Sequence, residues 1–168
     1  MRHYILWIPI ALLAAACGST TQPSNVVPAN GAALWSYLQQ HNYASAWSLW
    51  PGKGRLYPSC DRTQPVCTAH GMLLTTYLDS VALNALTSHA GTMPPNAIIV
   101  KENYMPDSTL AAVTVMYKIR GYDPAHADWF WLKVLPNDSV AAEGKVQGCI
   151  DCHALNASND YVWTASLQ

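Results

Sequence analysis

The chain has 168 residues and a formal net charge of −1, with 51% hydrophobic and only 11% charged residues. This length allows one domain with a substantial buried core. The near-neutral charge, without a basic cluster or a charge run, gives no support for binding of nucleic acid or of an anionic membrane surface. The charged fraction is well below the usual quarter of residues. An apolar pocket and an apolar leader would both contribute to the corresponding excess of hydrophobic residues.

The first 17 residues are typical of an export signal. Arg2 supplies a positive charge, and the apolar run Tyr4–Ala16 is too short to span a bilayer. The segment Leu13-Ala-Ala-Ala-Cys17 allows ordinary cleavage after small residues. It also resembles a bacterial lipobox, although Ala14 stands where lipoboxes usually carry Leu. We expect a periplasmic lipoprotein that is acylated at Cys17, with soluble secretion as the alternative.

A tether and a helix are predicted next. Residues 18–30 are rich in Gly, Ser, Thr, Gln, Pro and Asn, a composition that is typical of a flexible linker. The folded domain is therefore expected over residues 31–168. It begins with a helix from about Ala32 to Trp50, which Asn30 caps, although Asn42 interrupts its apolar face.

Four segments rich in β-branched and aromatic residues are predicted as strands, and turn residues divide them: Met72–Leu78, Ala97–Tyr104, Leu110–Arg120 and Trp129–Leu135. A short helix, about Val81–His89 with Asp79 or Ser80 as its cap, is expected between the first two strands. The other connections are too short for crossover helices, so antiparallel pairing is expected. The predicted fold class is α+β, with an antiparallel sheet of about four to five strands and flanking helices.

The pentapeptide Cys149-Ile-Asp-Cys152-His153 is the most specific feature of the chain. Two thiols at this spacing, followed directly by histidine, are typical of haem attachment through thioethers, with the imidazole on the iron. A redox-active pair would require a thioredoxin-like βαβ context, but only 15 residues follow His153. A structural zinc site would require four ligands, and no second pair of suitable spacing exists. We predict one haem c, bound through Cys149 and Cys152, with His153 as the iron ligand.

The chain contains five cysteines, and an odd number in an exported protein requires an explanation. Haem attachment takes Cys149 and Cys152, and lipidation takes Cys17. Cys60 and Cys67 then remain, in a proline-containing loop. An oxidising periplasm favours a disulfide between them, and two buried free thiols are the alternative.

Several segments, in this order, resemble the cytochrome P460 family: Ala97-Ile-Ile-Val-Lys-Glu-Asn-Tyr104, Thr114-Val-Met-Tyr-Lys118, Gly121-Tyr-Asp-Pro124, Asp128-Trp-Phe-Trp131, Gly144-Lys145, the CxxCH motif and Asn159-Asp-Tyr161. Upstream, Trp47-Ser-Leu-Trp-Pro-Gly-Lys53 and His70-Gly71 also resemble this family, so the resemblance covers residues 34–164. It implies a sheet-rich α+β fold, a homodimer and one c-type haem. The all-helical electron-transfer cytochromes c carry the motif near their start. The four-helix cytochromes c′ carry it near their end but contain no sheet, so neither class matches a late motif behind about four strands.

The resemblance implies one of two activities. The P460 enzymes oxidise hydroxylamine to nitrous oxide or nitric oxide at an open haem iron, and a lysine nitrogen is bonded to a meso carbon of their porphyrin. The related cytochromes c′-β lack this bond and bind nitric oxide or carbon monoxide. We expect hydroxylamine oxidation, with an unidentified redox acceptor. Gas binding is the alternative, and electron transfer, which would suit a methionine as sixth ligand, is a third reading.

Lys101 and Glu143 are the candidate catalytic residues that the resemblance implies. Lys101 lies in a Val-Lys-Glu segment that matches the cross-linking lysine, and it shares a strand face with Ile99 and Asn103. Burial would lower the pKa of its amine. Glu143 precedes the haem motif at about the place of a proton-accepting carboxylate in the enzymes. Without the family, either charge would be read as solvated. His70 would approach the pocket, bind a haem propionate, or serve as a structural histidine.

Overall fold

The computed structural model describes residues 26–59 and 70–168. The expected signal segment, most of the expected tether and the cysteines Cys17, Cys60 and Cys67 lie outside the described residues. Export, lipidation and the disulfide therefore stay predictions. Within the described ranges, no helix is both long and apolar enough to cross a membrane.

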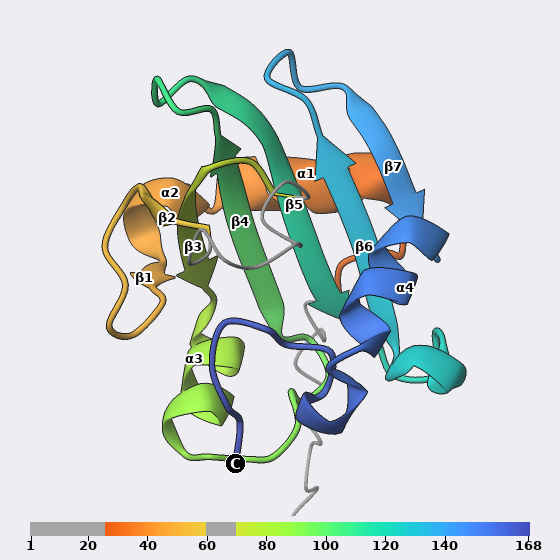
Figure 1. The fold of residues 1–168 in the computed structure, drawn as a ribbon. Helices are drawn as coiled ribbons and strands as arrows, with labels where there is room; N and C mark the ends of the chain where they lie inside the picture. Colours follow the sequence, from red (N-terminus) through yellow and green to blue (C-terminus); the bar gives the residue numbers. More distant parts are fainter. Residues whose placement is uncertain (1–25, 60–69) are drawn as a thin grey trace, which may run out of the picture.

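Seven strands of the described residues form one antiparallel sheet, in the order β1-β3-β4-β5-β6-β7, with β2 also paired to β3 (Figure 1). The strands are β1 (Ser48–Leu49), β2 (Tyr57–Pro58), β3 (Leu73–Leu78), β4 (Ile98–Tyr104), β5 (Leu110–Lys118), β6 (Trp129–Val134) and β7 (Val140–Gly144). The predicted α+β class and antiparallel pairing are confirmed. The four predicted strands are β3 to β6, and the sheet is extended by β7 and by two very short strands.

The helices of the described residues are α1 (Gly31–Gln40), α2 (Tyr43–Ala46), α3 (Ser80–Thr87) and α4 (Gln147–Ala154), with short 3-10 helices at Pro124–His126 and Ala157–Asn159. Asn30 caps α1 by accepting a hydrogen bond from the Ala33 amide, and Asp79 caps α3. The continuous helix predicted to Trp50 is wrong. Asn42 adopts the left-handed conformation, with φ 47° and ψ 47°, which asparagine tolerates better than most residues, and the chain turns there.

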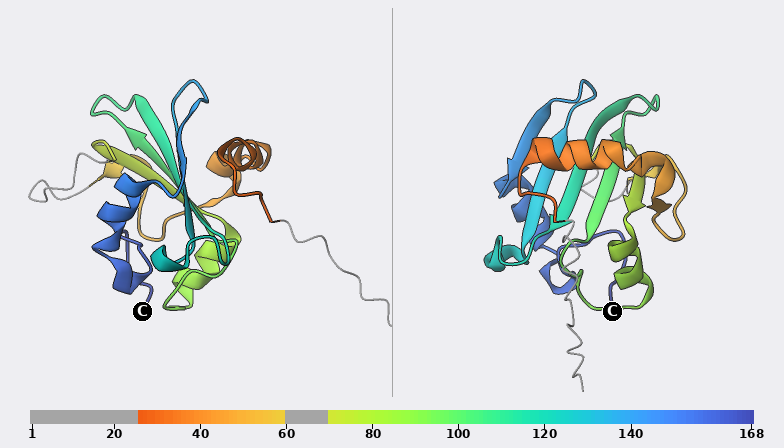
Figure 2. Two further views of the ribbon diagram at one scale, coloured as in Figure 1. Left: turned by 90° about the vertical axis from the view of Figure 1, so that its right-hand side faces the viewer. Right: turned by 180° about the vertical axis from the view of Figure 1, so that it is seen from behind.

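Helices cover both faces of the sheet (Figure 2). α1 crosses one face, α4 and the C-terminal segment lie on the other, and α3 lies near one end of the strands. A buried apolar cluster fills each side. On the α1 side it includes Leu34, Leu38, Val100, Val113 and Phe130, and on the α4 side it includes Trp50, Ile99, Trp129, Trp131 and Ile150.

The alternation of side chains along β4 decides which residues meet the α4 side. Val100 is buried in the cluster below α1, whereas Ile99 and Lys101 line a pocket on the opposite face. Asn103 lies on that same face, because its side chain contacts His70, another residue of the pocket. The shared face predicted for Ile99, Lys101 and Asn103 is confirmed.

Candidate haem pocket

The pocket lies between the sheet and α4 and has a volume of about 280 Å³. Its floor consists of residues that are paired across neighbouring strands, in two rows. One row is Ile99, Met116 and Trp131, and the other is Lys101, Thr114, Lys133 and Ala142. From the other side, α4 contributes Cys149, Cys152 and His153. Sheet register therefore brings the Val-Lys-Glu segment and the CxxCH motif to one cavity.

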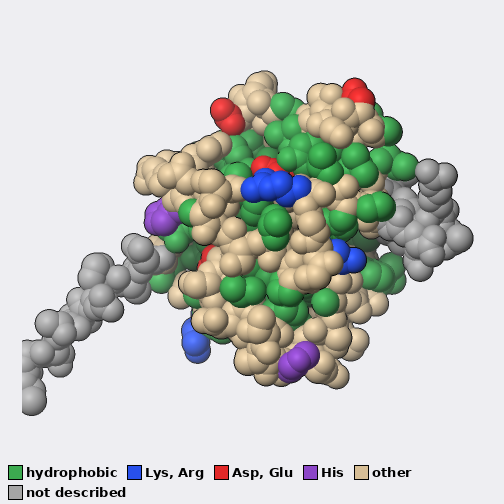
Figure 3. Space-filling model, turned by 90° about the vertical axis from the view of Figure 1, so that its left-hand side faces the viewer, with side chains coloured by type: hydrophobic (Ala, Val, Ile, Leu, Met, Phe, Trp, Pro, Cys, Tyr) green, Lys and Arg blue, Asp and Glu red, His purple; other side chains and the backbone are tan. Residues whose placement is uncertain are grey.

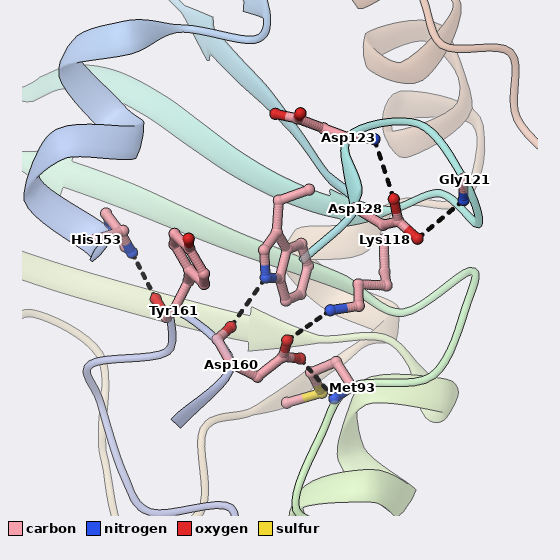
Figure 4. Close-up of polar contacts among 9 residues, drawn as sticks. Met93, Lys118, Gly121, Asp123, Asp128, His153, Asp160 and Tyr161 are labelled. Atoms are coloured by element: carbon pink, nitrogen blue, oxygen red, sulfur yellow. Dashed lines mark hydrogen bonds and ion pairs between the residues drawn. The ribbon is translucent and has the colours of Figure 1, made fainter. Parts of the chain in front are cut away.

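His153 is buried and its orientation is fixed by the backbone. Its Nδ1 donates a hydrogen bond of 2.7 Å to the carbonyl oxygen of Tyr161 (Figure 4). Because a carbonyl only accepts, Nδ1 carries the hydrogen and Nε2 carries the lone pair. Burial and the nearby charge of Lys101 lower the pKa of His153 to about 4, against the opposing effect of the bond to Tyr161. His153 is thus held as a neutral imidazole, the form that binds metals.

The carbonyl that orients His153 is itself held in place by Asp160 (Figure 4). The buried carboxylate of Asp160 accepts hydrogen bonds from Lys118 Nζ at 2.6 Å and from the Met93 amide at 2.7 Å. Its own carbonyl accepts a bond from Trp129 Nε1 at 2.9 Å. The segment behind His153 is therefore anchored to the sheet and to the loop after α3.

Cys149 and Cys152 lie on α4, both half-buried and unpaired. Residues three apart on a helix are neighbours on its surface, so both thiols face the pocket together with His153. Burial raises the pKa of Cys149. No helix was predicted for this motif, although a helix is what places the three side chains on one side.

Lys101 is half-buried and lines the pocket together with the CxxCH residues. Burial lowers the pKa of its amine to about 8, against the opposing effect of Cys152. A substantial fraction of the amine is therefore neutral at mildly alkaline pH, which makes it a nucleophile. Lys101 thus shares one cavity with the CxxCH residues, and its bond to a porphyrin stays a prediction.

Glu143 lies elsewhere. Its neighbour Ala142 lines the pocket, so the alternation of β7 turns Glu143 toward the opposite face of the sheet. There its Oε2 accepts a hydrogen bond of 2.7 Å from the amide of Gly31, the first residue of α1. A carboxylate at this place stabilises the positive end of the helix dipole. The structure does not bring Glu143 together with Lys101 and His153.

Lys133, with a positive charge, and Trp131, with an indole donor, also line the pocket, and Lys133 has no role in the sequence-based predictions. Lys133 alternates with Trp131 along β6, so the pattern of the strand would have placed both on one face. The indole Nε1 of Trp131 is buried and has no hydrogen-bond partner among the described residues. Its ring packs against His153 at 4.7 Å between centroids.

The residues of the pocket fit a haem. Its floor is largely apolar, two thiols and a lone-pair-bearing imidazole lie together, and Lys101 and Lys133 provide positive charge for carboxylate groups. No Asp or Glu is among the described residues that line it. A buried donor without a partner, such as Trp131 Nε1, needs an acceptor, and a propionate would supply one.

Among the methionines available as a sixth ligand, Met116 lines the pocket. Met93 is buried in the apolar cluster on the α4 side, whereas Met72 and Met105 are exposed. The position of Met116 on the floor leaves its side chain available to the cavity.

His70 also lines the pocket. Its Nδ1 is hydrogen-bonded to Asn103 at 3.0 Å, and its ring lies 6.1 Å from that of His153, with the two planes at 89°. Of the roles considered from the sequence, an approach to the pocket agrees with this position.

Comparison with protein families finds a match to the cytochrome P460 model over residues 57–164. The matched region runs from β2 through α4 and therefore includes every residue assigned above to the pocket. No curated protein sequence matches the chain.

Proposed function

Because the chain belongs to the cytochrome P460 family and is therefore a haem protein of the c type, we propose that it oxidises hydroxylamine in the pocket between the sheet and α4. The observation that carries this proposal is the position of Lys101, whose amine shares the cavity with Cys149, Cys152 and His153. When bound, the haem supplies an iron that binds small nitrogen compounds and takes up their electrons. A separate redox acceptor must then remove these electrons.

The chain's own residues would hold and shield the group. Cys149 and Cys152 would form the thioethers, and His153 would direct Nε2 to the iron while the carbonyl of Tyr161 holds Nδ1. The apolar floor excludes water, which strengthens electrostatic interactions within the pocket. Trp131, packed against His153, restricts rotation of the imidazole.

Lys101 would form the bond to the porphyrin that distinguishes the enzymes from the gas binders. This bond would replace one amine N–H and one meso C–H by a C–N bond, and its formation would release two protons and two electrons to a two-electron oxidant such as a peroxide. The pKa of about 8 supports this role, because the amine must be neutral to attack. The same argument does not apply to Glu143, which caps α1.

Lys101→Arg tests the proposal, because arginine keeps the charge but does not deprotonate. In the wild type we expect a strongly red-shifted ferrous Soret band and a haem peptide that also contains Lys101. Lys101→Arg should show an ordinary c-type spectrum and lose at least about tenfold in hydroxylamine turnover. Lys133→Arg, at the other pocket lysine, is the matched control and should keep the shifted band. Identical spectra for wild type and Lys101→Arg would exclude the cross-link.

One observation favours a second function, the binding of nitric oxide or carbon monoxide. The described lining of the pocket contains no carboxylate to accept the protons of hydroxylamine. An ordinary ferrous spectrum, tight gas binding and no hydroxylamine turnover would establish this alternative. A low-spin, six-coordinate iron that Met116→Leu converts to high spin would instead indicate electron transfer.

We also propose export to the periplasm, a lipid on Cys17, a Cys60–Cys67 disulfide and a homodimer. The support is the apolar leader, the lipobox-like segment and the cysteine count, and for the dimer the family resemblance. Intact mass of the membrane fraction would detect the lipid, and thiol titration of unreduced, denatured protein would test the disulfide. Light scattering would measure the oligomeric state.

A further inference from the structure

The side chain of Asn103 has a defined orientation. Its Nδ2 lies 2.9 Å from the carbonyl oxygen of Lys101 and 3.1 Å from that of Ala112, with Thr114 Oγ1 also at 3.1 Å. Carbonyl oxygens only accept, so the NH₂ group must face them. The other end of the amide, Oδ1, is therefore the atom that meets His70.

This orientation determines the tautomer of His70. Oδ1 of Asn103 only accepts, so Nδ1 of His70 donates across the 3.0 Å contact and carries the hydrogen. In the neutral ring, Nε2 then carries the lone pair. Because a free imidazole is mostly neutral above its ordinary pKa of about 6.5, the ring can accept a hydrogen bond at Nε2 near neutral pH.

His70 differs in this respect from the other polar side chains of the pocket. Lys101 and Lys133 are donors, Thr114 Oγ1 is already contacted by Asn103, and His153 is the family's iron ligand. Among the described lining residues, this leaves Nε2 of His70 as a side-chain acceptor that the fold orients without using it for the metal. A hydrogen bond at one ring nitrogen fixes the orientation of an imidazole and the state of its other nitrogen.

We propose that His70 selects the ligands of the pocket, by accepting at Nε2 a hydrogen bond from the N–H or O–H of hydroxylamine. Nitric oxide and carbon monoxide carry no hydrogen, so they gain nothing from this acceptor. The inference rests on the proposed function and names the residue that favours hydroxylamine over the gases. It also supplies an acceptor to a pocket whose described lining has no carboxylate.

The test uses the haem-loaded full chain without a redox acceptor. Optical titration gives the dissociation constant of hydroxylamine for the ferric protein and of carbon monoxide for the ferrous protein. His70→Phe should weaken hydroxylamine binding about tenfold, the order expected for one buried hydrogen bond, and should leave carbon monoxide binding unchanged or tighter. His41→Phe, at an exposed histidine of the opposite face, is the matched control and should change neither constant.

Asn103→Leu provides a second, spectroscopic readout. Without the amide oxygen, His70 is free to carry its hydrogen on Nε2 and to become a donor toward the pocket. The C–O stretching frequency of bound carbon monoxide should then fall, and hydroxylamine should bind more weakly. Haem content and thermal unfolding would show that the variants fold.

Three results would overturn the inference. His70→Phe could change both dissociation constants by the same factor, or change neither. Alternatively, a wild-type iron that is low-spin and turns high-spin in His70→Phe would make His70 an iron ligand and not a selector. Failure of the proposed function would give a different result. If the wild type binds hydroxylamine with the expected dependence on His70 but does not oxidise it, the proposed enzymatic activity is wrong and the inference about His70 stands.

Discussion

One residue step along β4 separates two charges in opposite environments. The amine of Lys101 lies in a pocket where no described lining residue is a carboxylate. The carboxylate of Glu102 lies on the other face and accepts hydrogen bonds from Tyr43 at 3.1 Å, Tyr77 at 2.9 Å and Tyr104 at 2.7 Å. A satisfied buried charge stabilises a fold, whereas a charge without a counterion is available for chemistry. Adjacent residues of one strand thus lie in two different environments, a satisfied buried cluster and an open pocket.

Glu143→Ala should affect stability and not catalysis. The substitution removes the acceptor of the Gly31 amide and the favourable charge at the start of α1, which should lower the free energy of unfolding by ~0.5–1 kcal/mol. Hydroxylamine turnover should stay within about twofold, because the carboxylate lies outside the pocket. Urea unfolding and steady-state kinetics measure the two quantities. A large loss of turnover at unchanged stability would restore Glu143 to the site.

Asp160→Asn should be strongly destabilising. It leaves Lys118 buried without its counterion, now 2.6 Å away, and breaking a buried ion pair costs about 3 kcal/mol or more. Asn tolerates the positive φ of 53° at this position, so backbone strain does not contribute.

The matched control is Asp128→Asn, at a second carboxylate with positive φ. Asp128 is partly exposed, and its carboxylate accepts hydrogen bonds from two backbone amides, those of Gly121 and Asp123 (Figure 4). Its replacement should cost about 1 kcal/mol. Denaturant unfolding compares the two, and equal losses would show that the Lys118–Asp160 pair does not stabilise the fold.

At the scale of elements, the start of β3 depends on Gly71. This glycine has φ +75°, and an added Cβ would lie 2.7 Å from the carbonyl oxygen of Tyr104 on β4. That oxygen is part of the backbone and accepts a hydrogen bond from the Met72 amide, so it cannot move aside without loss. The turn also positions His70 against Asn103.

Gly71→Ala should therefore lower the free energy of unfolding by about 2–3 kcal/mol. Gly91→Ala is the control that distinguishes backbone strain from a steric clash. Gly91 also has φ +75°, but no atom lies within 4 Å of an added Cβ. This control should cost only about 1 kcal/mol. Thermal or urea unfolding measures both variants. Equal losses of unfolding free energy would mean that the backbone at Tyr104 shifts to accommodate the added Cβ.

Long elements were predictable from local composition, and short ones were not. β3 to β6 are runs of six or more residues in which β-branched and aromatic side chains are frequent. β1 and β2 have two residues each and exist because β3 pairs with them. β7, with the sequence VAAEG, has little strand propensity of its own and is held by β6. Asn42 was noticed as an interruption, but only its left-handed φ shows that the helix ends before it.

The pocket also shows what local patterns omit. CxxCH and Lys101 were found from spacing and family resemblance, because each carries its signal in a few adjacent residues. Glu143 was placed by its distance from the motif along the chain, but the face of β7 on which it lies depends on pairing with β6. The carbonyl of Tyr161, which orients His153, has no side-chain signal at all.

At the scale of the whole molecule, space-filling from one side shows hydrophobic side chains gathered across the face, with few charges among them (Figure 3). The low charged fraction of 11% makes each buried ionisable group important for the dependence of stability on pH. The tyrosines around Glu102 form such a group on the α1 side. Burial and the Glu102 carboxylate raise the pKa of Tyr43 and Tyr77, and burial and a hydrogen bond to Glu102 raise that of Tyr104 to about 12.

We expect the protein to lose stability in alkali above about pH 10, where tyrosine ionises in unfolded chains. Because their pKa is raised in the folded state, the native protein keeps protons that the unfolded chain releases, so the stabilisation is complete below pH 10 and falls as pH rises. The slope should be at most about 1.4 kcal/mol per pH unit for each of the two buried tyrosines of this cluster, Tyr43 and Tyr77. Urea unfolding at a series of pH values measures it. Glu102→Gln should make the slope shallower, because burial alone then raises these pKa values, and a wild-type slope of zero would contradict the assignment of this cluster.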